Sequence, residues 1–119
     1  MESDNAATWR AVAVTPILPV TDLERSVSWL REVMGFGVNF IDGSWGSLGK
    51  DGFEFLLHVV DQPPEPGWIF VHVADVDRVF EGFRSSPGLV EPVESKPWGT
   101  REFVLEAPDG HRFRIGHGE

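Results

Sequence analysis

The order of apolar and polar positions along the chain follows one pattern twice. Extended apolar stretches span 11–20 and 68–73, and each is followed by apolar residues at helical spacing. These residues are Leu23, Val27, Leu30 and Met34 after the first stretch, and Val76, Phe80 and Phe83 after the second. Apolar side chains that recur every three or four positions lie on one face of a helix. The pattern therefore predicts a strand and then a helix in each half of the chain.

The expected helices have sequence signals at their ends. Thr21 and Glu24 have the spacing of a capping box, in which two side chains satisfy free N–H groups at the start of a helix. Gly35 and Gly88 are expected to mark the two exits, because glycine adopts the backbone conformation that ends many helices. These signals place one helix between 21 and 35 and another that ends before 88.

Three short strands are expected after each helix. Asp42-Gly43 and Asp51-Gly52 separate them in the first half, and Asp109-Gly110 separates the last two strands in the second half. Asp-Gly dipeptides favour the tight turns of hairpins. The unit that these signals predict is β-α-β-β-β, used twice.

Sequence matches between the two halves support a duplicated unit. Residues 20–25 recur 53 positions later as 73–78, and Trp45-Gly46-Ser47 matches Trp98-Gly99-Thr100 at the same offset. The register then slips by five, so that Lys50-Asp51-Gly52 matches Pro108-Asp109-Gly110 at an offset of 58. We predict one α+β domain, 1–119, made of a first module at 10–61, a linker loop at 62–66 and a second module at 67–117.

Composition narrows the expected partners and location. The chain has 119 residues, 41% of them hydrophobic, which suits a single globular domain rather than a disordered chain. Its formal charge of −9 repels phosphate backbones and anionic lipids, so neither nucleic acid nor a membrane is an expected partner. The polar, acidic residues 1–5 lack the basic and apolar regions of a secretory signal, and we expect a cytoplasmic location.

Several kinds of chemistry lack the residues that they need. The chain has no cysteine, which removes disulfides, thiolate metal sites and cysteine nucleophiles together. It has no Gly-x-Ser-x-Gly turn, and its glycine clusters at 43–52 and 110–118 belong to expected hairpins rather than to phosphate loops before a helix. These patterns identify no catalytic residue.

One stretch of the second half carries a specific resemblance. Residues 96–103, Lys-Pro-Trp-Gly-Thr-Arg-Glu-Phe, and 107–110, Ala-Pro-Asp-Gly, are similar to the matching strand and turn of bleomycin-resistance proteins. Residues 20–23 and 34–36 resemble the more general signature of the vicinal oxygen chelate superfamily, which includes glyoxalase I, extradiol dioxygenases and fosfomycin-resistance enzymes. The resemblance spans 10–117 and implies two incomplete barrels whose concave sheet faces hold a divalent metal or an organic ligand. The sequence departs from this resemblance at one position: drug-binding members have the motif Trp-Gly-Arg-Glu-Phe, and here Thr100 is an extra residue between its Gly and its Arg.

The metal positions that the resemblance implies carry unsuitable residues. They correspond to Thr15 and Trp68 on the first strands of the two modules, and to Leu56 and Arg114 on the last strands. A divalent ion needs imidazole or carboxylate ligands, whereas tryptophan cannot coordinate it and a guanidinium repels it. We therefore expect neither a metal nor another cofactor.

Aromatic residues are the stronger functional signal. The chain has five Trp, nine Phe and no Tyr. Alternation along strand 68–73 places Trp68, Phe70 and His72 opposite the apolar residues that face the helix. The bleomycin-resistance resemblance further implies that Phe40 and Trp98, from opposite subunits of a homodimer, stack on a flat ligand. The residues expected to bind the ligand are Phe40, Glu54, His58, Trp68, Phe70, Trp98, Glu102 and Arg114.

The leading hypothesis is a metal-free protein that sequesters a planar organic ligand or drug in a groove at the dimer interface. The acidic charge favours a cationic ligand. The alternative is an enzyme of the same superfamily, a lyase, an isomerase or a dioxygenase-like protein, that uses Glu54, His58 or Glu102 as its base or a relocated metal site. A third hypothesis, a dimerisation module with a vestigial groove, predicts no small-molecule binding.

Overall fold

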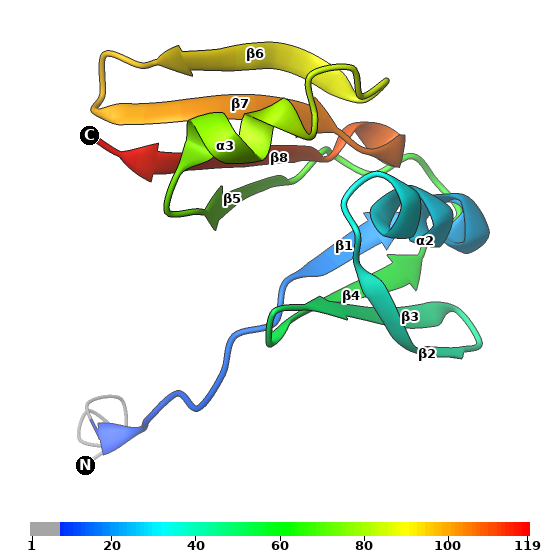
Figure 1. The fold of residues 1–119 in the computed structure, drawn as a ribbon. Coiled ribbons are helices and arrows are strands. Elements are labelled where there is room, and N and C mark those ends of the chain that lie inside the picture. The colour runs from blue at the N-terminus through cyan, green and yellow to red at the C-terminus, as the bar shows by residue number, and fades with distance from the viewer. Residues whose placement is uncertain (1–7) are drawn as a thin grey trace.

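Two four-stranded sheets, each with one helix, make up the fold. The computed structural model describes residues 8–119 (Figure 1). The first sheet has the strand order β1-β4-β3-β2, and the second has the order β5-β8-β7-β6. The elements are β1 Ile17–Val20, α2 Leu23–Glu32, β2 Gly37–Asp42, β3 Trp45–Lys50, β4 Phe53–Val59, β5 Trp68–His72, α3 Val76–Glu81, β6 Leu89–Ser95, β7 Thr100–Glu106, η1 Pro108–Gly110 and β8 Arg112–Gly118. The predicted fold class, α+β with two tandem β-α-β-β-β modules, is confirmed.

The parallel strand pairs of the two modules are related by the offsets found in the sequence. In the first sheet Ile17 pairs with Leu56. In the second sheet Phe70, 53 positions after Ile17, pairs with Arg114, 58 positions after Leu56. The first and last strands of the two modules therefore occupy equivalent places.

The middle strands do not keep the offset of 53. Trp45 lies opposite His58 on β4, and Glu102 lies opposite Gly116, the residue 58 positions after His58, on β8. The structural counterpart of Trp45 is therefore Glu102, and the match of Trp45 with Trp98 is wrong. Trp98 precedes β7 in the loop after β6. The offset on the third strand is 57, so four of the five positions of register change come before that strand and one comes after it.

Both helices begin at an aspartate. The carboxylate of Asp22 accepts a hydrogen bond from the N–H of Arg25 at 3.0 Å, and Asp75 does the same for Arg78. The predicted capping box is therefore wrong, because the hydroxyl of Thr21 donates to Asp109 instead.

The helix exits differ from each other. The first helix ends as expected near Gly35, whose φ of 74° favours glycine. The second helix is shorter than expected, since α3 ends at Glu81 and Gly88 lies beyond it. The Asp51-Gly52 turn has φ values of 53° and 84°, as a two-residue hairpin loop requires, and it joins β3 to β4.

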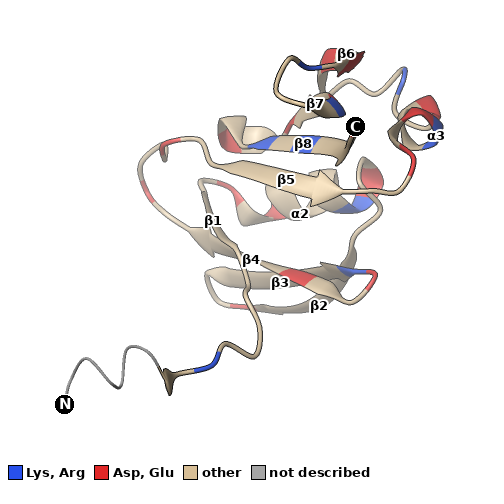
Figure 2. Ribbon diagram, turned by 90° about the vertical axis from the view of Figure 1, so that its left-hand side faces the viewer, with Lys and Arg blue, Asp and Glu red and all other residues tan. Residues whose placement is uncertain are grey.

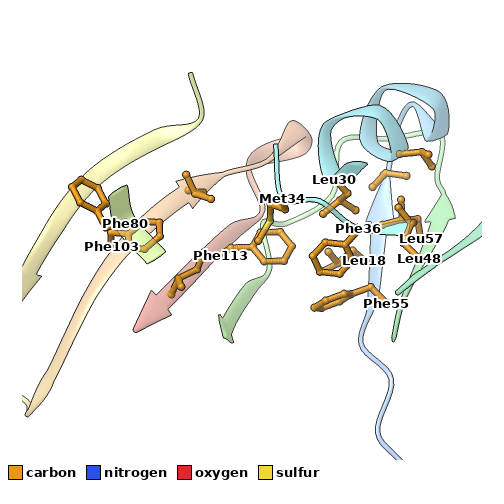
Figure 3. Packing of buried hydrophobic residues seen from close by; sticks show 14 of the residues in the cluster. Leu18, Leu30, Met34, Phe36, Leu48, Phe55, Leu57, Phe80, Phe103 and Phe113 are labelled. Carbon is orange, nitrogen blue, oxygen red and sulfur yellow. The ribbon is translucent and has the colours of Figure 1, made fainter. Parts of the chain in front are cut away.

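A continuous hydrophobic core extends through both modules. Figure 3 shows Phe113 between the residues around Phe80 and Phe103 and those around Leu18 and Phe55. The rings of Phe55 and Phe113 meet edge to face with centroids 5.8 Å apart. Phe80 is buried, as the helical pattern of apolar positions predicts, whereas Phe83, predicted on the same face, is only partly buried.

Polar side chains also join the modules. His111 is 1% exposed, and its Nδ1 accepts a hydrogen bond from the N–H of Gly67 at 2.8 Å. Its Nε2 lies 2.6 Å from the carbonyl oxygen of Pro19 on β1, so this nitrogen carries the proton. Asp109 accepts hydrogen bonds from the N–H and the hydroxyl of Thr21. The turn before β8 thus holds the end of β1 in place.

The sheet edges formed by β2 and β6 are unlike each other. β6 carries Glu91, Pro92 and Glu94, residues that hinder pairing with a further strand. β2 is exposed along its whole length and contains Val38, Phe40 and Ile41.

The segment that precedes β1 extends away from the body of the molecule (Figure 1). Val12 is 99% exposed and Val14 is 88% exposed. A single chain thus leaves these apolar side chains uncovered. Separately, no helix within residues 8–119 is long and apolar enough to span a membrane.

Candidate ligand-binding faces

Each sheet has one face turned away from the core. In β4 the side chains of Phe55 and Leu57 are buried in the core, so alternation places Glu54, Leu56 and His58 on the other side. We call this side the open face of the first sheet; it also carries residues paired with or bonded to these positions, namely Ile17, Asn39, Phe40, Trp45 and Ser47.

The open face of the second sheet is defined in the same way. Ile69 and Val71 of β5 pack on the core, so Trp68, Phe70 and His72 face away from it, as predicted. Neighbouring strands add Glu91, Glu94, Thr100, Glu102, Val104, Glu106, Arg112 and Arg114 to this face. The blue segments along β8 in Figure 2 mark its basic positions.

Glu102 lies at the centre of the second open face and is only 1% exposed. Its carboxylate accepts a hydrogen bond from the hydroxyl of Thr100 at 2.6 Å and another from the guanidinium of Arg114. Burial on its own would raise the pKa of Glu102. The hydrogen bonds from Thr100 and Arg114, the charge of Arg114 and a hydrogen bond from Trp98 outweigh burial, so the pKa lies below its usual value. Glu102 is thus a paired, charged carboxylate rather than a free base.

Two tryptophans lie over the charged groups of this face. The guanidinium of Arg114 is 4.7 Å from the ring centroid of Trp68, and that of Arg112 is 5.8 Å from it. The ammonium of Lys96 is 5.8 Å from the ring of Trp98. These are cation–π distances, which fix the rings while leaving their outer surfaces open. Trp68 remains 59% exposed and Trp98 64% exposed.

Lys96 is a site residue that the sequence argument missed, although it opens the motif at 96–103. Its ammonium bonds the carboxylates of Glu94 at 2.7 Å and Glu91 at 3.0 Å. These hydrogen bonds raise the pKa of Lys96. Alternation could not have placed both carboxylates beside Lys96, because Glu91 and Glu94 are three positions apart and share a face only through the register shift between them.

The first open face has a polar chain of three residues. The amide of Asn39 donates to the hydroxyl of Ser47 at 3.1 Å, and this hydroxyl donates to the carboxylate of Glu54. Ser47 is fully buried, whereas Glu54 is exposed. The chain therefore presents an oriented carboxylate to the solvent side of the sheet.

Aromatic rings flank this carboxylate on the same face. Trp45 stacks on His58 with ring centroids 4.1 Å apart, and Phe40 is half exposed. Nδ1 of His58 is buried and has no hydrogen-bond partner among the residues that the structure describes. Asn39, Trp45 and Ser47 are not among the site residues that the sequence predicts. The alternation of β3 against β4 could have placed Trp45 beside His58.

The eight residues expected to bind a ligand divide between the two faces. The second open face brings together Trp68, Phe70, Trp98, Glu102 and Arg114. The first open face holds Phe40, Glu54 and His58. A depression of about 790 Å³, lined by α2 and β2, lies on the helix side of the first sheet. None of the eight expected ligand residues lines it.

The metal positions implied by the superfamily do not fit an ion. Arg114 is paired with Glu102 and stacked on Trp68, and Leu56 offers no ligand atom. Within residues 8–119, no three His, Cys, Asp or Glu side chains lie together as a metal site needs. We therefore derive no chemistry through a metal at these positions.

Comparisons with known proteins agree with this architecture. The family model of the glyoxalase/bleomycin resistance protein/dioxygenase superfamily matches residues 11–115. A search of the curated proteins finds no match.

Solved structures of the same fold include drug-binding proteins. A bleomycin-binding protein from bleomycin-producing Streptomyces verticillus, complexed with copper(II)-bleomycin, has a TM-score of 0.77 and 20% identity over 94% of this chain and 100% of that one. A bleomycin resistance determinant encoded on transposon Tn5 has a TM-score of 0.76 and 21% identity over 92% and 99%. TioX from Micromonospora sp. ML1 has a TM-score of 0.74 and 24% identity over 92% and 100%. The two-module fold and the match over nearly the whole sequence lead to one conclusion: the chain belongs to the glyoxalase/bleomycin resistance protein/dioxygenase superfamily.

Proposed function

We propose that this protein is a homodimer that binds a planar organic ligand between its open sheet faces, without a metal. The ligand stacks on Trp68 and Trp98 of the second open face and on Phe40 of the first. Arg114 and Glu54 orient its polar groups, and Phe70 and His58 complete the walls. Glu102 supports these contacts from below, because its buried oxygens are already engaged within the chain.

The observation that carries the proposal is the pair of exposed indoles on one sheet face. A hydrophobic core would bury such rings, yet Trp68 and Trp98 keep more than half of their surface exposed while cations hold them from one side. Exposed, oriented indoles are suited to stacking on flat ligands.

The charge distribution supports a cationic ligand. The exposed carboxylate of Glu54 faces out beside the aromatic rings Phe40 and Trp45. On the second open face the cations Lys96, Arg112 and Arg114 are already paired with carboxylates, so they offer little net attraction to an anion. The net charge of −9 likewise favours a cationic ligand.

A homodimer is proposed because the two groups of ligand residues lie on different sheets. In a dimer with a twofold axis, the first open face of each chain can lie against the second open face of the other. The dimer then has two equivalent ligand sites. Such an arrangement would also cover apolar side chains that a single chain exposes, among them Ile17, Phe40 and Trp68.

Calorimetric titration of the purified protein with metal-free bleomycin, copper(II)-bleomycin and the planar cation ethidium tests this function. We expect saturable binding of at least one probe and a rise in melting temperature with it, since only a ligand that prefers the native state stabilises it. No heat and no thermal shift with any probe would contradict a drug-sequestering role.

Trp98→Ala separates a ligand contact from a packing residue. We expect about a tenfold or greater loss of affinity, because an aromatic stacking contact contributes about 0.5–1.5 kcal/mol beyond burial, with the free energy of unfolding nearly unchanged. Phe53→Ala is the matched control, since Phe53 is 74% exposed but its side chain points to the helix side of the first sheet. Loss of several kcal/mol of stability in Trp98→Ala would instead assign this indole to packing.

A further inference from the structure

Glu102 is connected to an exposed ring of the second open face. Its carboxylate accepts hydrogen bonds from Thr100 at 2.6 Å and from Arg114. The guanidinium of Arg114 in turn lies 4.7 Å from the ring centroid of Trp68. One buried carboxylate therefore holds the cation that stacks on this indole.

The backbone beside Glu102 leaves room for this carboxylate. Gly116 pairs with Glu102 across β7 and β8. A Cβ atom at position 116 would lie 2.7 Å from Cβ of Glu102 and 2.5 Å from the carbonyl oxygen of Arg101, distances that real Cβ atoms do not reach. Glycine at this position thus lets β7 and β8 approach closely under the Glu102 side chain.

Thr100 has a defined place in this arrangement. It is the extra residue of the motif at 96–103, and its hydroxyl is one of the donors to Glu102. A charged carboxylate that is removed from water needs its oxygens satisfied, and each donor that is present lowers the cost of keeping the charge. The extra residue therefore adds a donor where the carboxylate is 1% exposed.

We propose that Glu102 is a positioning residue of the second open face: its carboxylate fixes Arg114 and, through it, the orientation of Trp68, and Thr100 holds the carboxylate in place. The assignment of Trp68 to ligand binding rests on the proposed function, but its positioning does not. The decisive experiment therefore needs no ligand.

The indole N–H signal of Trp68 in uniformly ¹⁵N-labelled protein reports this ring directly, and the spectrum of Trp68→Phe assigns it. Glu102→Gln keeps the shape of the side chain and removes its charge, which weakens the bond to Arg114. We expect the Trp68 signal to shift and broaden in Glu102→Gln, and to shift less in Thr100→Val. The signals of Trp9, Trp29 and Trp45 should stay in place.

Glu106→Gln is the matched control. Glu106 lies on the same face of β7 and pairs with Arg112, whose guanidinium is farther from the ring of Trp68, at 5.8 Å. This variant should shift the Trp68 signal less than Glu102→Gln does. An unchanged Trp68 signal in a folded Glu102→Gln protein would overturn the proposal, whatever its stability, since a merely structural carboxylate predicts that result.

Ligand titration then distinguishes a failure of the positioning role from a failure of the proposed function. If the Trp68 signal changes in Glu102→Gln and affinity for the probe falls, both the positioning role and the proposed function stand. A changed Trp68 signal with no binding by the unaltered protein would reject the proposed function alone. Binding that is retained while the Trp68 signal stays fixed would reject the positioning role alone.

Discussion

Among single residues, Ser26 is expected to lower the free energy of unfolding. It is 3% exposed on the core side of α2, and its hydroxyl has no hydrogen-bond partner among the described residues. The neighbouring buried groups are largely apolar, among them Leu18, Val20 and Leu57. A buried hydroxyl without a partner loses its hydration and gains nothing in exchange.

Ser26→Ala is therefore expected to raise the free energy of unfolding by about 0.5–2 kcal/mol, because it removes an unsatisfied group and improves helix propensity. Urea unfolding monitored by circular dichroism measures the change. Ser28→Ala, on the same helix at a partly exposed position, reports the propensity effect by itself. Equal effects of the two substitutions would mean that the Ser26 hydroxyl is satisfied in solution.

Glu102 makes a residue-level contribution that depends on pH. Its pKa in the folded chain lies below the usual value, so the fold favours the charged form. The stability that results is present above the ordinary glutamate pKa of about 4.3 and is lost as the pH falls through the lower, folded value. Unfolding curves between pH 7 and pH 3 should show a smaller acid-induced loss for Glu102→Gln than for the unaltered chain. Identical pH profiles would contradict this assignment.

At the level of elements, the turn before β8 holds the two modules together. His111 satisfies a backbone N–H before β5 and a backbone carbonyl on β1, and its ring is buried beside the core. Asp109 adds hydrogen bonds to the residue before the first helix. Because these groups come from different modules, they couple the two sheets more specifically than apolar packing does.

His111→Ala is expected to lower the free energy of unfolding by about 2–4 kcal/mol, since it leaves a cavity and two unsatisfied backbone groups. His117→Ala is the control, because within residues 8–119 His117 accepts a single hydrogen bond, from Val76 of its own module. Denaturant unfolding of both variants checks the difference. If the two variants lose the same free energy of unfolding, the contacts of His111 between the modules stabilise the fold no more than the contact of His117 within one module does.

The repeat and its fold could be predicted from the sequence because apolar spacing and turn dipeptides act locally. The positive φ values of Asp51 and Asp109 confirm the matched turns, and alternation placed Trp68 and Phe70 on the correct side of β5. The match of Trp45 to Trp98 failed because an identical residue pair outweighed strand register, which the pairings of Trp45 with His58 and of Glu102 with Gly116 reveal. Sequence alternation assigns Glu102 a side of the sheet, but its pairing with Arg114 depends on the register of β7 against β8, which alternation alone does not fix.

On the scale of the whole molecule, exposed apolar side chains point to self-association. Val12 and Val14 before β1 and several rings on the open faces are uncovered in one chain. Their burial in a second copy would contribute about 25 cal/mol for each Å² of apolar surface removed from water. The proposed dimer uses this surface to form the ligand sites.

Sedimentation equilibrium is expected to give a mass of twice 13.3 kDa. The melting temperature should rise with protein concentration, because dilution favours the uncovered single chain. Bleomycin or ethidium, if bound between two chains, should strengthen the association. A mass of 13.3 kDa with a melting temperature independent of concentration would show that one chain is stable by itself.

The residues along the edge of β6 have a consequence for storage and expression of the protein. Pro92 is a position without an N–H donor on the outermost strand β6 of the second sheet, between Glu91 and Glu94. A strand from another molecule cannot complete the ladder at Pro92, so this edge is a poor template for fibril growth. Concentrated solutions should therefore resist conversion to amyloid at this edge, and a chain with valine at 92 and 94 should lose that protection and bind thioflavin T.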